Sequence, residues 1–246
     1  MTQPTPIRIS MWSGPRNIST TMMRAFENRP DTLVVDEPFY ACYLKASGAD
    51  HPYREETLAA MATDWREVVR ALAAPLPAGK TILFEKHIAY HYPDAEPLDW
   101  LLTHRTFLLI RDPRRMVASF SKKFDDIAPI SDSYRVARRI FNFLTAGGAP
   151  CPIVDAADVL GDPEGSLRAL CAALDIPFTE KMLSWPAGPR PSDGPWAPHW
   201  YDAVNASTGF KPLAEAPLDL PPNLEQPANA CRKDYEFLYA RRLRAD

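Results

Sequence analysis

The fold is decided by a stretch near the start of the chain, IRISMWSGPRNISTTMMRAF at residues 7–26. Its first six residues are mostly apolar and β-prone, and a Gly-Pro turn signal follows them. Three apolar residues then recur every four positions, as on one face of a helix: Ile18, Met22 and Phe26. The stretch therefore predicts a strand, a loop and a helix, in that order.

Short apolar runs and helical patterns alternate along the rest of the chain. Four further strands are predicted at 32–35, 81–84, 106–110 and 152–156, and helices at 55–74, 113–123, 133–145 and 163–174. This alternation predicts an α/β fold of three layers, with a central parallel sheet and right-handed crossovers. In such sheets ligands bind at the carboxyl ends of the strands, where four polar residues are expected to emerge: Ser13, Asp36, Lys86 and Arg111.

Length and proline content predict one domain over residues 1–246. A chain of 246 residues can bury one substantial core. Its 26 prolines are roughly twice the usual frequency, and many fall in the segment 185–227. We expect that segment to wrap over the core in an extended or partly disordered form, and a C-terminal helix to follow at about 228–244.

Charge and cysteine usage exclude several classes of protein. With a net charge of -3 the chain has no general attraction for nucleic acid, so any polyanion that it binds must be small and met by local cations. Its four cysteines form no Cys-x-x-Cys pair, which argues against a zinc site or a disulfide framework. The first residues do not resemble a signal peptide, and no apolar run is long enough to cross a membrane. We therefore expect a cytoplasmic protein without a membrane partner.

The loop after the first strand is a candidate anion site. A glycine turn between a strand and a helix directs backbone N–H groups and the positive helix end at one point. Residues 14–21 keep the Walker A spacing, but Ser19 replaces the second glycine and Thr20 replaces the lysine that neutralises the β- and γ-phosphates. The alternative is that Asn17, Ser19 and Thr20 cap the helix after an ordinary turn at Gly14.

A second candidate anion site follows the strand at 106–110. Asp112 is a good helix N-cap and Pro113 a good first helical residue, so Arg111 lies at the strand tip. Side chains lean toward the N-terminus of a helix, so Ser119 can reach back toward Arg111 and both can hold one phosphate. The alternative is a surface ion pair between Arg111 and Asp112.

These two motifs resemble those of sulfotransferases, which use 3′-phosphoadenosine-5′-phosphosulfate (PAPS) as sulfuryl donor. Gly-Pro-Arg followed by Ser-Thr-Thr resembles their 5′-phosphosulfate loop, although the loop here is one residue longer and lacks a glycine. An Arg followed eight residues later by a Ser resembles the pair that holds the 3′-phosphate. The resemblance covers mainly residues 7–125. It implies a P-loop-like sulfotransferase fold and these donor-binding residues: Gly14, Pro15, Arg16, Asn17, Ser19, Thr20, Thr21, Arg111 and Ser119.

The same resemblance implies PAPS as co-substrate and a small-molecule acceptor with a hydroxyl or amine. Sulfuryl transfer needs a base for the acceptor proton and cations for the leaving oxygen, and no metal is required when Arg and N–H groups supply the charge. Glu37 resembles the glutamate of the Glu-Pro segment in carbohydrate-type sulfotransferases and is the first candidate base. Arg16 is the candidate cation.

Lys86 and His87 loosely resemble the Lys-Thr-His segment of cytosolic sulfotransferases, which makes His87 the second candidate base and Lys86 a cation for the transferred group. Neighbours on a strand point to opposite faces, so at most one of the two is expected in the site. His51, His91, His104 and His199 have weaker claims. Six aromatic residues are candidate walls of an acceptor pocket: Phe39, Tyr40, Tyr43, Trp196, Trp200 and Tyr201.

Two other classes of function stay open. The Walker-like spacing, with Asp36 and Glu37 as a magnesium-binding pair, fits a P-loop kinase or nucleotide hydrolase. The longer loop also fits a non-catalytic protein that keeps the fold and presents its Pro-rich tail to a partner. The acceptor and the oligomeric state cannot be read from the sequence.

Overall fold

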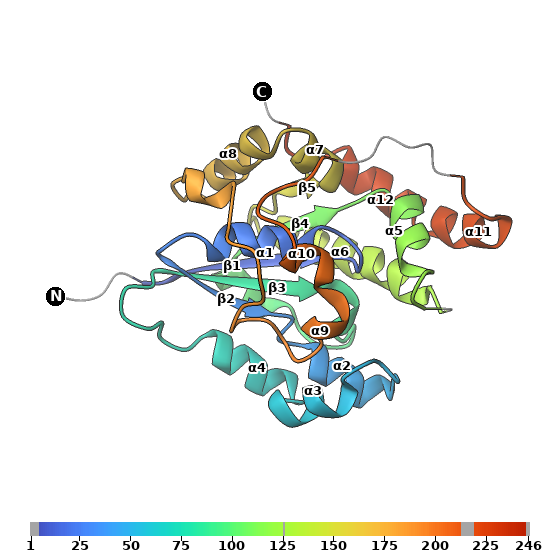
Figure 1. The fold of residues 1–246 in the computed structure, drawn as a ribbon, viewed down its shortest axis with the longest axis horizontal. Coiled ribbons are helices and arrows are strands. Elements are labelled where there is room, and N and C mark those ends of the chain that lie inside the picture. The colour runs from blue at the N-terminus through green and yellow to red at the C-terminus, as the bar shows by residue number, and fades with distance from the viewer. Residues whose placement is uncertain (1–4, 125, 213–218, 245–246) are drawn as a thin grey trace.

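The centre of the molecule is a five-stranded sheet whose paired strands are all parallel. The computed structural model describes residues 5–124, 126–212 and 219–244. The strands lie in the order β2-β3-β1-β4-β5 (Figure 1). Their bounds are β1 Ile7–Ser13, β2 Thr32–Asp36, β3 Ile82–Ile88, β4 Arg105–Ile110 and β5 Ile153–Asp155. The predicted α/β fold with a central parallel sheet is confirmed.

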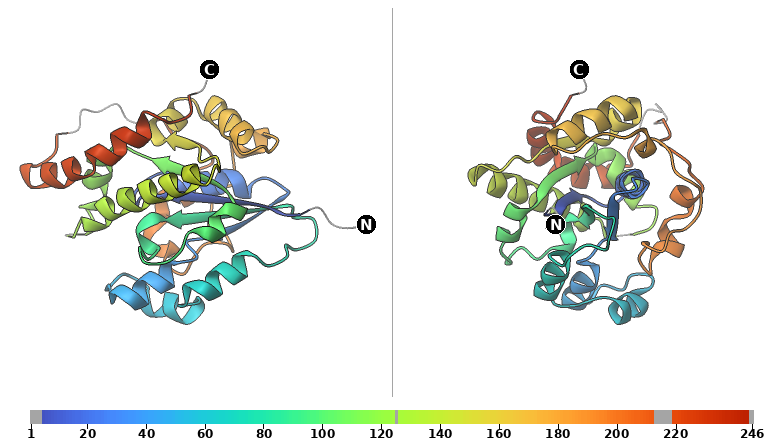
Figure 2. Two further views of the ribbon diagram at one scale, coloured as in Figure 1. Left: turned by 180° about the vertical axis from the view of Figure 1, so that it is seen from behind. Right: turned by 90° about the vertical axis from the view of Figure 1, so that its left-hand side faces the viewer.

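Helices cover both faces of this sheet. One face packs against α1 (Ser19–Glu27), α7 (Ala156–Gly161) and α8 (Pro163–Ala173). The other packs against α4 (Trp65–Leu72), α6 (Ala128–Ala146) and α12 (Arg232–Tyr239), with the 3₁₀ turns η1 (Ala89–His91) and η2 (Asp99–Thr103) beside them. Seen from behind, α6 crosses the face opposite α1 (Figure 2). The molecule therefore has three layers.

The remaining helices border this three-layer core. Helices α2 (Tyr40–Ser47) and α3 (Arg54–Ala60) follow β2, whereas α5 (Pro113–Phe120) follows β4 and contacts α11 (Pro222–Ala230). A 3₁₀ turn, η3 (Glu180–Met182), lies after α8. No helix of the described residues has both the length and the apolar character to span a bilayer.

Side chains on β1 and β3 alternate between the two apolar cores. Phe84 stacks on Phe26 of α1, with ring centroids 4.1 Å apart, whereas Leu83 belongs to the core under α6. This period of two is what a pleated strand requires. Lys86, two residues after Phe84, therefore lies on the α1 face, and His87 lies on the α6 face.

The helix expected at 133–145 begins earlier, at Ala128. Three other predicted elements also differ from the observed ones. The helix expected at 55–74 is two helices, α3 and α4, because the chain is extended at Met61 and the Asp64 side chain caps a new helix by accepting from the Arg66 N–H. The strand expected at 81–84 continues to Ile88. Its charged residues concealed the extension, since buried charges are rare unless they are paired. In place of one helix at 228–244, α11 and α12 follow each other.

A long excursion after α8 lies beside the carboxyl edge of the sheet. Its ends meet where Ser184 bridges Gly209 and the Trp185 N–H donates to the Thr208 carbonyl at 3.1 Å. We call residues 184–209 the strap; it carries α9 (Ala197–Trp200) and α10 (Asp202–Asn205), in orange in Figure 1. The strap is part of the segment 185–227 that was expected to wrap over the core. Residues 213–218 of that segment lie outside the described residues.

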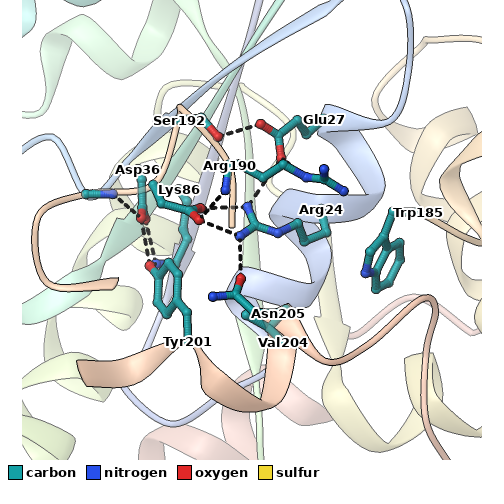
Figure 3. Close-up of polar contacts among 12 residues, drawn as sticks. Arg24, Glu27, Asp36, Lys86, Trp185, Arg190, Ser192, Tyr201, Val204 and Asn205 are labelled. Carbon is teal, nitrogen blue, oxygen red and sulfur yellow. Dashed lines mark hydrogen bonds and ion pairs between the residues drawn. The ribbon is translucent and has the colours of Figure 1, made fainter. Parts of the chain in front are cut away.

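The strap is fastened to α1 by a buried ion pair. The Arg24 guanidinium, 1 % exposed, donates to the Asp193 carboxylate at 2.8 Å. It also donates to the Asn205 side chain at 3.3 Å (Figure 3). Glu27 lies 3.3 Å from the same guanidinium. A buried charge requires such partners, so this cluster holds the strap in one position.

Candidate functional site

The loop between β1 and α1 is held in an unusual conformation. Arg16 has a φ of 55°, which is uncommon for a residue with a side chain. The Asn17 amide donates to the Leu109 carbonyl of β4 at 2.9 Å, and its oxygen accepts from the Ile18 N–H at 2.9 Å. Helix α1 starts without a side-chain cap, so Asn17 does not cap it. The positive end of α1 is therefore available to an anion.

Gly14 has a packing role in this loop. A Cβ at Gly14 would lie 2.3 Å from the Met116 Cε of α5. A side chain at this position would therefore displace the end of the Met116 side chain from its place against the loop.

The two predicted anion-binding motifs, the loop after β1 and the segment from Arg111 to Ser119, contact each other. Arg111 donates to the Arg16 carbonyl at 2.6 Å, and the Arg16 side chain donates to the Ser119 hydroxyl at 3.2 Å. Asp112 accepts from the N–H groups of Arg114 and Arg115, so it caps α5. The alternative ion pair between Arg111 and Asp112 is therefore not formed.

Neither guanidinium has a carboxylate partner in the part of the chain that the structure describes. Among the described residues, neither Arg16 nor Arg111 takes part in an ion pair. Burial lowers the pKa of both, and the charges of Arg115 and Arg16 lower the pKa of Arg111 further. Two partly buried cations that repel each other are stabilised by an anion placed between or beside them.

Lys86 lies at the centre of a buried polar cluster. Its ammonium donates to Asp36 at 2.7 Å, to Glu37 at 2.6 Å and to the Tyr201 hydroxyl at 2.8 Å. Tyr201, from the strap, in turn donates to the second Asp36 oxygen at 2.7 Å (Figure 3). Burial opposes the charge on Lys86, but the two carboxylates raise its pKa well above the ordinary value. All three of its N–H groups are therefore used within the protein.

Glu37, the first candidate base, is a buried carboxyl with a raised pKa. Its backbone φ is 43°, a second uncommon conformation beside the site. Burial raises the pKa of Glu37 to about 7, with Asp36 adding to the effect and Lys86 opposing it. A carboxyl with a pKa near the working pH exchanges protons most effectively.

His87 lies away from these groups. Its ring stacks on Trp12 at 4.2 Å, and its Nε2 lies 3.1 Å from a Glu85 oxygen. A second histidine, His104, holds the other Glu85 oxygen at 3.1 Å. As strand alternation predicts, Lys86 enters the site and His87 does not. His87 therefore lies apart from Glu37, the other candidate base.

One cavity of about 360 Å³ joins the candidate residues. It is lined by all the predicted site residues except Gly14 and His87: Pro15, Arg16, Asn17, Ser19, Thr20, Thr21, Glu37, Lys86, Arg111 and Ser119. Of the predicted aromatic walls, four line it: Tyr40, Trp196, Trp200 and Tyr201.

Sequence analysis missed Tyr90 as a lining residue and gave His91 only a weak claim. Tyr90 and His91 line the cavity because β3 reaches Ile88 and delivers them to the carboxyl edge of the sheet. Lys211 also lines it, just beyond the strap. A longer β3 in the prediction would have brought Tyr90 and His91 to this edge.

Comparison with known proteins finds relatives that cover most of the chain. A model of the sulfotransferase domain family matches residues 7–227. Two curated Arabidopsis thaliana proteins, branched-chain-amino-acid aminotransferase-like proteins 2 and 1, are 40% and 39% identical over 217 residues, which are 87% and 88% of this chain. The chain spans only 38% and 39% of their lengths.

Two solved structures have the same fold at low sequence identity. The sulfotransferase domain of the Synechococcus PCC 7002 olefin synthase has a TM-score of 0.56 at 16% identity, covering 99% of this chain and 98% of that one. A sulfotransferase from Alicyclobacillus acidocaldarius has a TM-score of 0.52 at 12% identity, with 99% and 98% covered.

Proposed function

Since the chain belongs to the sulfotransferase domain family, we propose that it transfers a sulfuryl group from PAPS to a hydroxyl or amine of a small molecule. The observation that carries the proposal is that one cavity is lined by both guanidiniums, which have no ion-pair partner among the described residues, by the first residues of α1, and by Glu37. A sulfuryl transferase needs these two features close together, because the donor is an anion and the acceptor must lose a proton.

The donor would be held by the two contacting motifs. The backbone N–H groups at the start of α1 and the side chain of Arg16 suit the 5′-phosphosulfate, since a helix N-terminus and a cation both favour an anion. Arg111 and Ser119 suit the 3′-phosphate. Because Arg111 also fixes the Arg16 carbonyl, its loss would disturb both ends of the donor.

In the proposed reaction the acceptor attacks sulfur in line with the bridging oxygen. The new bond forms to the acceptor atom, and the bond between sulfur and the bridging oxygen breaks. Its electron pair leaves on 3′-phosphoadenosine-5′-phosphate (PAP), and the acceptor proton passes to Glu37. Arg16 would stabilise the charge that develops on the leaving oxygen.

Lys86 has an indirect role in this scheme. Its three N–H groups are used by Asp36, Glu37 and Tyr201, so none is directed at a transferred group. We therefore assign Lys86 to hold Glu37 in position and to favour its ionised form. The same contacts argue against the kinase alternative, since Asp36 and Glu37, the carboxylates that would hold magnesium, both accept from Lys86, and Thr20 replaces the Walker lysine.

Calorimetry with PAP tests the donor site. We expect PAP to bind the wild type, and Arg111→Ala to weaken binding about 10- to 100-fold through loss of charge-assisted hydrogen bonds. Arg70→Ala, at an exposed arginine on α4, is the matched control and should bind like the wild type. ATP with magnesium is titrated in parallel. No heat with PAP from the folded protein, or tighter binding of ATP, would refute the proposal.

Glu37→Gln separates binding from catalysis. Glutamine keeps the shape of the side chain but cannot take a proton, so PAP affinity should be unchanged while turnover of PAPS falls by about 10²- to 10⁴-fold. Transfer of labelled sulfur to the acceptor measures the effect. Wild-type turnover in this variant would show that another group is the base.

A further inference from the structure

His91 is a buried histidine at the wall of the cavity. It ends the 3₁₀ turn η1 that directly follows β3, and only 3% of it is exposed. Its ring stacks on Tyr40 at 4.5 Å and on Tyr43 at 5.0 Å, with the Tyr90 ring edge-on at 4.4 Å. Three aromatic rings therefore fix the orientation of the imidazole.

Neither ring nitrogen of His91 has a hydrogen-bond partner among the residues that the structure describes. Nδ1 lies 3.6 Å from Oε2 of Glu37, which is too long for a hydrogen bond. Glu37 Oε1 is held by Lys86, so Oε2 is the oxygen left for a ligand. An unsatisfied buried polar group costs free energy, and at a cavity wall it indicates a missing partner.

The imidazole is neutral in this position. Burial lowers the pKa of His91 well below the ordinary value, and the nearby His51 and Lys86 lower it further. A neutral imidazole has one N–H donor and one nitrogen lone pair. It can therefore donate a hydrogen bond without placing a charge beside the acceptor.

We propose that His91 donates a hydrogen bond to the acceptor oxygen while Glu37 takes the proton of that oxygen, so that the site selects hydroxyls over amines. This inference rests on the function proposed above. A hydroxyl oxygen has two lone pairs: one accepts from His91, and the other attacks sulfur. A neutral amine has a single lone pair, so an amine that accepts from His91 has none left for the attack.

The groups around His91 indicate what kind of acceptor molecule carries this hydroxyl. Tyr40, which stacks on His91, also meets the Trp196 ring edge-on at 4.8 Å and hydrogen-bonds His51 at 2.8 Å. His51 in turn meets Phe124 at 5.0 Å. Burial lowers the pKa of His51, so this wall is aromatic and uncharged. It fits a flat, uncharged body such as a phenol.

In the transfer step, one bond to sulfur forms and one breaks. The acceptor oxygen forms a bond to sulfur, and its proton passes to Oε2 of Glu37. The bond between sulfur and the bridging oxygen of PAPS breaks, and its electron pair leaves with PAP. His91 gains and loses no proton, so it positions the nucleophile and does not act as the base.

Paired acceptors test the selection. Transfer of labelled sulfur from PAPS is measured to 2-naphthol and to 2-naphthylamine, two compounds of the same shape that are both uncharged near pH 7. We expect at least a tenfold preference of the wild type for the naphthol in kcat/KM. Equal use of the two, a preference for the amine, or transfer to neither while PAP still binds, would overturn the inference.

Variants at His91 test the hydrogen bond itself. His91→Ala should lower kcat/KM for 2-naphthol about 10- to 100-fold, and His91→Gln should recover part of it because an amide N–H can donate. PAP affinity, measured by calorimetry, should change less than twofold in both variants, which also checks that they are folded. Arg70→Ala is the control.

PAP binding separates a failure of the proposed function from a failure of the proposed role of His91. If the wild type does not bind PAP, the proposed function fails and this inference with it. If PAP binds but His91→Ala keeps wild-type turnover, only the role of His91 is wrong. If PAP binds and His91→Ala loses turnover but Gln recovers none of it, the assignment of His91 as a hydrogen-bond donor is overturned.

Discussion

Replacing the buried lysine of the site, as Lys86→Met, should destabilise the protein and change its pH–rate profile. Methionine has a similar length and leaves Asp36 and Glu37 without the ammonium that lies 2.7 Å and 2.6 Å from them. Breaking a buried ion pair by removing one partner costs about 3–5 kcal/mol. For a domain of this size that corresponds to a melting temperature lower by roughly 6–20 °C.

The loss of stability in Lys86→Met should be larger at high pH than at low pH. The pKa of Glu37 is raised to about 7, so folding favours its protonated form, and this contribution disappears as the pH rises through about 7. Without Lys86 the pKa of Glu37 rises further, since the charge and the hydrogen bond that lower it are both gone. We therefore expect a loss of about 1–2 kcal/mol at pH 5.5 and of about 3–5 kcal/mol at pH 8.5.

Urea denaturation at the two pH values measures this difference. Lys45→Met, at an exposed lysine on α2, is the matched control and should change the free energy of unfolding by less than about 0.5 kcal/mol. In turnover assays the acidic limb of the Lys86→Met profile should move to higher pH. A loss that is equal at both pH values, or smaller than about 1 kcal/mol at pH 8.5, would refute the reasoning.

Three further predictions follow from the described contacts. Wild-type kcat should rise with pH to a plateau above about 7, because Glu37 must be ionised to accept a proton; a profile that is flat from pH 5.5 to 8.5 contradicts this. Asp193→Ala should cost about 3 kcal/mol in urea denaturation and speed proteolysis within the strap, since the buried Arg24 loses its main partner. Gly14→Ala should cost about 1–2 kcal/mol through its overlap with Met116, and a Gly14→Ala, Met116→Ala double variant should lose less than the sum of the two single changes.

The fold and the donor side of the site were readable from local patterns. The strand-loop-helix order at the first motif, and the helix cap and proline after the fourth strand, are encoded by residues that are neighbours in the chain. Local patterning also predicted that Arg16 and Arg111 would lie at one edge of the sheet. It could not predict that Arg111 holds the Arg16 carbonyl, because that contact spans 95 residues.

The residues on the proposed acceptor side of the cavity are placed there by the position at which β3 ends. A β3 ending at residue 84 leaves the orientation of Lys86 and His87 open, whereas a β3 that continues to Ile88 sends Lys86 to one face and His87 to the other. The same extension brings His91 to the cavity. The charged residues that make this stretch look like a loop can be buried because they are paired, Glu85 with His87 and Lys86 with Asp36 of β2.

The sequence by itself therefore determined the α/β class, the parallel sheet and the two candidate anion-binding motifs, since turn chemistry and periodicity act over a few residues. Only the tertiary structure decided which histidines line the cavity and how Lys86 is used. That lysine is bound by Tyr201, 115 residues further along the chain. Contacts of this range form when the strap packs against the sheet, and no local pattern specifies them.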